Sequence, residues 1–179
     1  PQHRPWLLSL PSRGARWPGR GHFANSPAKE PNPMKIKALA VQDTAFLHIK
    51  NVDGELLHES TPQGDQPVGI TLYGPGTKIY ANALAAKQAR LVERMRKRDK
   101  QGVPTATEAE DDAADNVQLL VEVTAGFQHI EYDAPDGTPL AGAALYKAVY
   151  SSQPLGFIAE QATRFLSSWA NFKPASATN

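Results

Sequence analysis

The most regular pattern of apolar and polar positions lies in residues 68–100. Residues 69–73 alternate, with Ile70 and Leu72 on one face, and this period of two predicts a strand. The run Gly74-Pro75-Gly76 then ends the extended segment, because glycine permits positive φ and proline fixes its own φ. A strand that stops at a tight turn is therefore expected here.

A long helix is predicted directly after this turn. Thr77 is a typical N-cap residue, and from Lys78 the chain has no internal glycine or proline until Gly102. Apolar side chains recur at helical spacing and predict a stripe that can pack. The members of this stripe are Tyr80, Leu84, Leu91 and Met95.

Before this stretch the pattern is that of short strands. Residues 36–40 alternate weakly and residues 45–50 more clearly, whereas Asn51-Val52-Asp53-Gly54 carries the Asp-Gly signal of a tight turn. Residues 55–58 are expected to return, and residues 69–73 complete a small, mostly antiparallel sheet. His48 and His58 are expected to face one another across this hairpin.

Helices dominate the second half of the sequence. Gln101–Ala106 is expected to be a linker, and Thr107-Glu108-Ala109-Glu110 has the spacing of a capping box. The helix that follows is expected to end near Gly126. Its expected inward side chains are Val117, Leu120, Val121 and Thr124.

Two further helices are predicted after a loop at residues 133–137. The first places Leu145 and its neighbours on one face, and the second begins near Pro154 with Ser152 as its cap. The second carries the stripe Ile158, Ala162, Phe165, Leu166 and Trp169, which is expected to enter the core. These elements predict an α+β domain over residues 34–172, with about four helices and a frayed tail at 173–179.

The predicted long helix ends in a basic segment. Between residues 90 and 100 the basic residues exceed the acids by four: Arg90, Arg94, Arg96, Lys97, Arg98 and Lys100 against Glu93 and Asp99. Acids gather at the start of the next helix, at Glu108, Glu110, Asp111, Asp112 and Asp115. We expect the two groups to neutralise each other in part. A nucleic-acid surface is the alternative.

Residues 1–33 differ in composition from the rest. They hold seven of the 15 prolines, five of the 19 Lys and Arg, and one of the 18 Asp and Glu, so residues 34–179 hold 14 basic against 17 acidic residues. The first methionine is Met34. We interpret the prefix as upstream sequence translated in frame; a transit peptide or an arm that touches nucleic acid are the alternatives.

Known chemical motifs find little support in the sequence. Gly74–Lys78 has the wrong glycine and lysine spacing for a phosphate loop, and residues 108–115 lack the spacing of a calcium loop. His129 and Glu131 are expected to form an exposed pair. The chain has no cysteine and no apolar run of roughly 20 residues. We therefore expect a soluble cytosolic protein that has no catalytic residues, cofactor or metal.

Several phrases, taken in order, resemble the tail assembly chaperones of long-tailed bacteriophages. The resemblance covers roughly residues 68–172. The phrases are I-T-L-Y-G-P-G-T (Ile70–Thr77) before a helix that is first Ala-rich and then Arg/Lys-rich, Thr124-Ala125-Gly126-Phe127 after an acidic helix, D-G-x-P-L (Asp136–Leu140), Leu145-Tyr146, P-L-G-F-I-x-E-Q (Pro154–Gln161) and F-x-x-x-W-A-N-F (Phe165–Phe172). Ala141–Ala144 departs from the family's Ser-Pro-Glu-Asn type of helix start, and Phe127 stands where the family often has Trp.

The resemblance implies a non-enzymatic protein made in the host bacterial cytoplasm while the tail is built, and absent from the mature virion. Its partners would be the tape-measure protein and the tail-tube protein. Self-association into a homo-oligomer stays open. A permanent component of the tail or head–tail junction is the alternative, and a nucleic-acid-binding module comes third.

A holdase role requires apolar surface with a charged rim. On the residues alone, the predicted long helix and the last helix are the candidates for the apolar surface. The charged rim is predicted at Arg94, Arg96, Lys97 and Arg98.

Deleting residues 1–33 is expected to leave the melting temperature unchanged. The prefix is aperiodic and Pro-rich, so it buries too little apolar surface to offset the entropy of ordering it. Thermal unfolding followed by circular dichroism checks this, and a drop of several degrees would contradict it.

Overall fold

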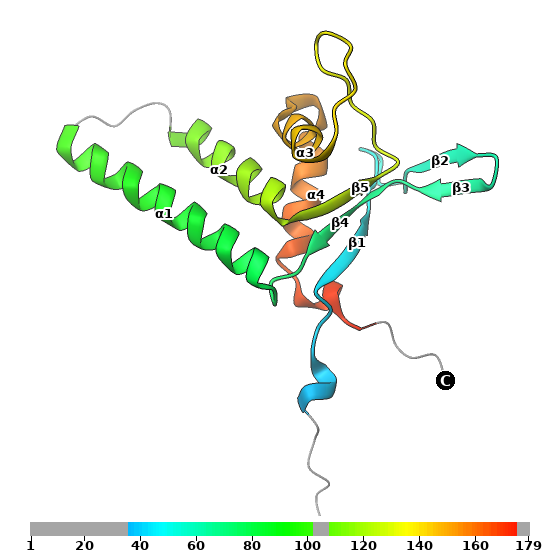
Figure 1. The fold of residues 1–179 in the computed structure, drawn as a ribbon, viewed down its shortest axis with the longest axis horizontal. Helices are drawn as coiled ribbons and strands as arrows, with labels where there is room; N and C mark the ends of the chain where they lie inside the picture. Colours follow the sequence, from blue (N-terminus) through cyan, green and yellow to red (C-terminus); the bar gives the residue numbers. More distant parts are fainter. Residues whose placement is uncertain (1–35, 102–107, 175–179) are drawn as a thin grey trace, which may run out of the picture. The chain divides into compact units, whose positions relative to one another are not determined.

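A computed structural model describes residues 36–101 and 108–174, and it confirms the predicted α+β class (Figure 1). The expectations for residues 1–33, for most of the linker and for the capping-box residue Thr107 lie outside these residues. The elements in chain order are η1 (Ile36–Leu39), β1 (Thr44–His48), β2 (His58–Thr61), β3 (Gly64–Pro67), β4 (Gly69–Tyr73), α1 (Lys78–Gln101), α2 (Glu108–Val123), β5 (Thr124–Gln128), α3 (Gly142–Ser151), η2 (Gln153–Leu155), α4 (Gly156–Leu166) and η3 (Trp169–Phe172).

The predicted strand β4 is the central strand of a three-stranded antiparallel sheet with the order β1-β4-β5. In this register Ala45 lies opposite Leu72 and Leu47 opposite Ile70. Ile70 also lies opposite Phe127 of β5. These side chains share one face of the sheet, and Ile70 and Leu72 are completely buried. The alternation read from the sequence thus identified the face that enters the core.

The start of the domain differs from the expectation. Residues 36–39 form a 3-10 helix rather than a strand. The turn at Asn51–Gly54 is confirmed: the side chain of Asn51 accepts the N–H groups of Asp53 and Glu55, and Gly54 has a φ of 88°. However, the returning segment forms only an isolated bridge, just past the end of β1. Strand β1 itself pairs along its whole length with β4. A separate hairpin, β2–β3, follows this turn and was not predicted.

Strand β5 corrects the expected end of the second helix. Helix α2 ends at Val123, and the chain continues directly as a strand from Thr124. The Thr124 hydroxyl donates to the Leu120 carbonyl at 2.7 Å and shares a hydrogen bond of 2.9 Å with the Tyr150 hydroxyl, which anchors the junction. Ala125 has no partner in the β4–β5 ladder and forms a bulge.

The core lies between one face of the sheet and the helices α2, α3 and α4. It is a single cluster of buried apolar side chains, most of them at positions that the helical and strand periods predicted. Its members are Ile49, Ile70, Leu72, Ala83, Leu120, Val123, Leu145, Val149, Tyr150, Ile158, Ala162, Leu166 and Phe172. Helix α1 contributes only Ala83 to it, which separates this helix from the others.

The last helix follows the predicted stripe only up to Leu166. Ile158, Ala162 and Leu166 are buried, and Phe165 is half-buried against Phe172 with 5.6 Å between ring centroids. Trp169, expected in the core, is 56% exposed. The chain turns into η3 after Leu166, so the helical period no longer applies and Phe172 takes the buried place. Ser152 makes no capping hydrogen bond, and Pro154 lies in η2.

Phe172→Ala is expected to destabilise the domain by about 3–5 kcal/mol, because the ring is fully buried. It lies so close to Gly74 that a Cβ on that glycine would meet a ring carbon at 2.5 Å. Trp169→Ala is the matched control and should cost about 1 kcal/mol or less. Urea unfolding curves measure both, and equal losses would contradict the assignment.

Candidate partner-binding surface

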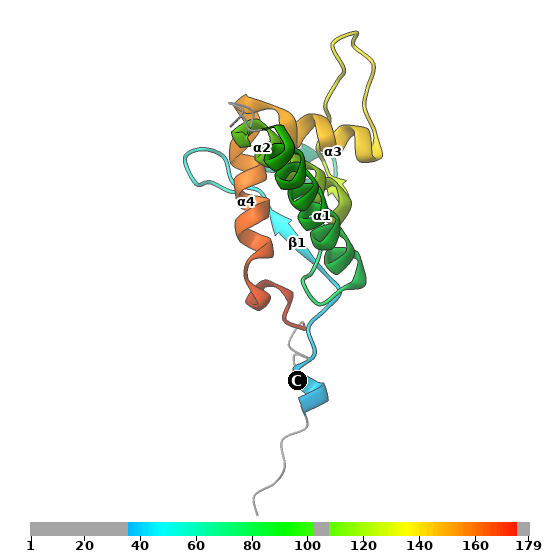
Figure 2. The same ribbon diagram turned by 90° about the vertical axis from the view of Figure 1, so that its left-hand side faces the viewer.

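Helices α1 and α2 form an antiparallel hairpin that extends away from the sheet (Figures 1 and 2). Thr77 caps α1 as predicted: its hydroxyl accepts the Tyr80 N–H at 3.2 Å and donates to the Gly74 carbonyl at 2.8 Å. Beyond its first turns, α1 has α2 as its main packing partner among the described elements. The contacts between these two helices therefore determine which side of α1 stays open.

A buried carboxylate joins the two helices. The Asp115 side chain on α2 is 7% exposed and receives two guanidinium groups of α1. Arg90 Nε donates to Asp115 Oδ1 at 2.6 Å, and Arg94 Nη1 donates to Asp115 Oδ2. Arg94 Nη2 also donates to Asp112 Oδ1 at 2.9 Å, and Lys87 Nζ donates to Asn116 Oδ1. We call this set the Asp115 clamp.

The clamp holds Asp115 in its charged form. Burial alone would raise the pKa of this carboxyl group, but the hydrogen bonds and charges of Arg94 and Arg90 outweigh it and lower the pKa. The pKa of Arg94 is raised, chiefly by its hydrogen bond to Asp115. The expected neutralisation of basic and acidic segments is therefore confirmed for Arg90 and Arg94, chiefly through the buried acceptor Asp115, with the exposed Asp112 as a second partner of Arg94.

The structure describes the side chains of three of the four predicted rim residues. Arg94 is part of the Asp115 clamp. Arg96 and Lys97 are exposed, and Lys97 Nζ lies 3.8 Å from Glu93 Oε1. The side chain of Arg98 lies outside the described part of the chain. Arg96 and Lys97 thus remain as the described candidates for a charged rim.

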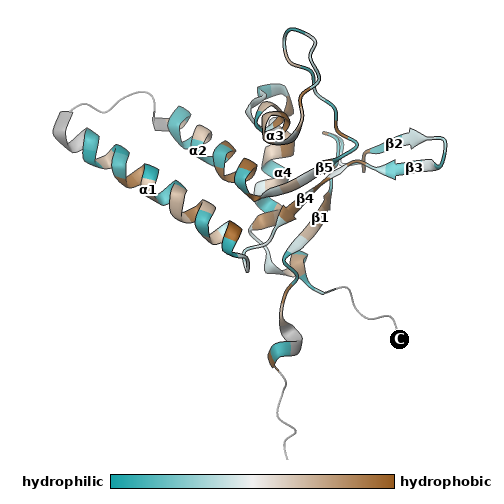
Figure 3. Cartoon of the chain, in the orientation of Figure 1, coloured by the Kyte–Doolittle hydropathy of each residue, from teal (hydrophilic) through white to brown (hydrophobic). Residues whose placement is uncertain are grey.

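The apolar stripe predicted on α1 does not pack into the core along its length. Tyr80 contacts the core and Leu84 is half-buried, whereas Leu91 is 43% and Met95 54% exposed. Val92, beside Leu91, is 48% exposed and was missed in the sequence. Figure 3 shows apolar and polar residues alternating along this helix.

Two heptad patterns overlap on α1 and explain this exposure. Ala83, Lys87, Arg90 and Arg94 face α2, and the side chains spaced four and three residues apart on the neighbouring face are Leu84, Gln88, Leu91 and Met95. We call the second set the α1 outer seam. Its spacing is that of the a and d positions of a coiled coil. Reading α1 for two patterns rather than one would have found it in the sequence.

The histidines do not assemble a metal centre. His48 and His58 face each other as predicted, with ring centroids 4.7 Å apart, but His48 Nε2 lies 2.6 Å from the Leu57 carbonyl. His129 Nδ1 lies 2.6 Å from Glu59 Oε2 and pairs with this side chain, not with Glu131 as expected. Within residues 36–101 and 108–174, no group of three potential ligands could hold a metal ion.

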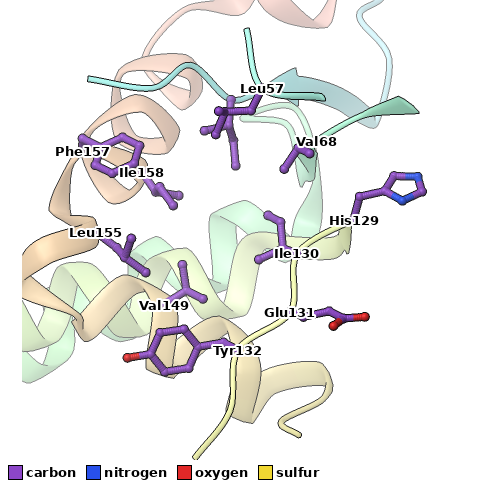
Figure 4. Close-up of a pocket in the computed structure, with 11 residues that line it drawn as sticks. Leu57, Val68, His129, Ile130, Glu131, Tyr132, Val149, Leu155, Phe157 and Ile158 are labelled. Atoms are coloured by element: carbon purple, nitrogen blue, oxygen red, sulfur yellow. The ribbon is translucent and has the colours of Figure 1, made fainter. Parts of the chain in front are cut away.

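A hollow lies where the ends of β1 and β4 meet the loop after β5. This cavity of about 260 Å³ is lined mainly by apolar side chains from the residues just after β1 and just before β2 and β4, from the 129–132 loop, and from α3, η2 and α4. Ile130 points into it, whereas the polar ends of His129 and Glu131 point away from it (Figure 4). The cavity therefore has no converging polar groups that would indicate a chemical reaction.

Comparisons of the chain with protein-family models, with curated proteins and with solved structures found no match. Across the part of the chain that the structure describes, no helix combines the length and the apolar character that a bilayer crossing needs. The α1 outer seam is the candidate partner-binding surface among the described residues.

Asp115→Asn is expected to destabilise the domain by about 2 kcal/mol at pH 7, because it removes the buried charge that accepts from Arg90 and Arg94. The pKa of Asp115 is lower in the folded state than in the unfolded chain. Its contribution is thus present above the unfolded pKa of about 3.9 and is lost as the pH falls through the folded pKa.

Unfolding free energies measured between neutral and acidic pH check this. The difference between the parent and Asp115→Asn should shrink as the pH falls below about 4. The exposed turn residue Asp53, changed to Asn, is the control and should follow the parent. A constant difference at every pH would contradict the role of the Asp115 clamp.

Proposed function

We propose that this protein is a non-enzymatic tail assembly chaperone of a long-tailed bacteriophage. It would bind the tape-measure protein and help to recruit tail-tube subunits in the host bacterial cytoplasm, and would be absent from the mature virion. The ordered phrases between residues 68 and 172 support the family. The observation that carries the binding role is the exposed α1 outer seam on a hairpin that extends from the domain.

The seam suits a helical client. A long helix that has not yet assembled exposes an apolar stripe, and a row of side chains at a and d spacing offers that stripe a matching surface. Leu91 and Met95 are the apolar contacts available there, with Val92 beside them. Arg96 and Lys97 follow Met95 but lie off the seam, because Arg96 shares the heptad position of Asn82 and Ala89 on the other side of α1. They would meet acidic residues of a client only where the client extends past the end of the seam. Client binding would then depend on apolar contact first and only weakly on charge.

In the alternative, the protein is a permanent component of the tail or head–tail junction. It would then use the same surface for a permanent protein–protein contact. Finding the protein in purified virions would favour it. The nucleic-acid alternative is weakened by the Asp115 clamp, because Arg90 and Arg94 already hold carboxylates. Residues 34–179 also carry more acidic than basic residues, which opposes general attraction to DNA.

The proposal is tested by co-expressing the affinity-tagged chain with the tape-measure and tail-tube proteins of the same phage. Leu91→Glu with Met95→Glu should abolish capture of the tape-measure protein, because two charges enter the apolar contact. The control is Asn82→Glu with Ala89→Glu, two exposed positions on the side of α1 away from the seam. Arg96→Gln with Lys97→Gln should weaken capture much less than the seam variant, because both residues lie off the seam. Failure of the parent protein to capture the tape-measure protein would contradict the proposal.

A second measurement addresses nucleic acid. Residues 34–179 are expected to show no salt-sensitive retention on duplex DNA at physiological ionic strength, since a phosphate-binding surface would give affinity that falls steeply with salt. Fluorescence anisotropy with a labelled duplex measures this. Micromolar binding that is lost in Arg96→Gln with Lys97→Gln would favour the nucleic-acid alternative.

A further inference from the structure

We propose that, in the absence of a client, two copies of this chain pair through their α1 outer seams in antiparallel orientation. The two α1–α2 hairpins would then form a four-helix bundle. The starting point is that α1 has one face on α2 and a second face of a and d spacing that no described residue covers fully. Leu91 and Met95 on that second face remain about half-exposed.

The seam is complementary to itself when reversed. Placing the two-fold axis between Gln88 and Leu91 brings Leu84 opposite Met95 of the second copy and Gln88 opposite Leu91. Every layer then contains at least one large apolar side chain. An isologous contact of this kind needs the same surface on both partners, and one row of side chains supplies it. Gln88 is a polar residue at an a-type position, which fixes register in coiled coils.

The flanks of the seam favour a second copy over a highly charged partner. On one side lie Ala85 and Val92, which are apolar and exposed and would meet each other across an antiparallel pair. On the other side lie Arg94, whose charge is paired with Asp115 and Asp112, and Lys87, whose ammonium group donates to the neutral Asn116 side chain and keeps its charge. The seam thus has one cation beside it, not a row of charge that would require an oppositely charged partner.

The dimer is expected to be weak and exchangeable. From Leu84 to Met95 the seam is roughly 16 Å long at about 1.5 Å per residue, which is less than two heptads. A contact of this length falls at the small end of specific interfaces, so the dissociation constant should be on the order of 10 µM. If the proposed function holds, the dimer covers the seam until a longer client helix displaces the second copy.

Sedimentation velocity on the full chain without any client tests the pairing itself. The parent should shift from monomer to dimer over a concentration series through the micromolar range. Leu91→Glu with Met95→Glu should remain monomeric, whereas Asn82→Glu with Ala89→Glu should dimerise like the parent. Circular dichroism melting checks that each variant is folded; because the changed residues are exposed, all should melt within a few degrees of the parent.

The absence of cysteine allows a second measurement that does not depend on disruptive charges. Gln88→Cys places a thiol beside the two-fold axis, and a short bismaleimide should join two copies through it. Asn82→Cys places a thiol on the side of α1 away from the seam and should give little linked product. Crosslinking that is equal at both positions would overturn the proposed geometry.

The remaining outcomes separate the pairing from the proposed function. A parent that stays monomeric through the whole series would overturn the dimer, and so would a dimer that survives Leu91→Glu with Met95→Glu. A monomeric parent that still captures the tape-measure protein through the seam would overturn self-pairing and leave the proposed function intact. A seam-dependent dimer that captures no tail protein would support the pairing and overturn the function.

Discussion

The Asp115 clamp is the interaction on which the arrangement of the hairpin depends. Helix α2 has two tasks: Leu120 and Val123 enter the core, while Asp115 on another side receives Arg90 and Arg94 from α1. Because α1 adds only Ala83 to the buried cluster, charge-assisted hydrogen bonds take the place that apolar packing has elsewhere. A buried carboxylate is strongly destabilising when its cationic partners are misplaced. The Asp115 clamp therefore also fixes which side of α1 faces α2.

That choice of side determines the surface of the protein. Once Lys87, Arg90 and Arg94 face α2, the α1 outer seam must point elsewhere, because it lies on a neighbouring face of the same helix. Two of the six basic residues between 90 and 100, Arg90 and Arg94, are neutralised in the same step. One set of contacts thus exposes Leu91 and Met95 and weakens the case for a nucleic-acid surface.

Local patterns in the sequence predicted several elements well. Strand β4, the Gly-Pro-Gly turn, the Thr77 cap and the start of α1 depend on residues close together in the chain, and all of them are confirmed. Strand β5 was missed because Thr124–Gln128 contains a glycine and continues an amphipathic helix without any turn signal. Its conformation depends on pairing with β4, about 55 residues earlier in the chain.

The sequence by itself determined the α+β class, the buried face of β4, the apolar stripe of α4 up to Leu166 and the opposite charges of the two hairpin helices. Only the tertiary structure decided which apolar residues remain at the surface. Helical spacing predicts that Leu91, Met95 and Trp169 share faces with residues that pack on the core. It does not predict how far the core extends along each helix. The core ends where α1 leaves the sheet and where η3 replaces α4. Beyond those points the same periodic residues find little to pack against within residues 36–101 and 108–174.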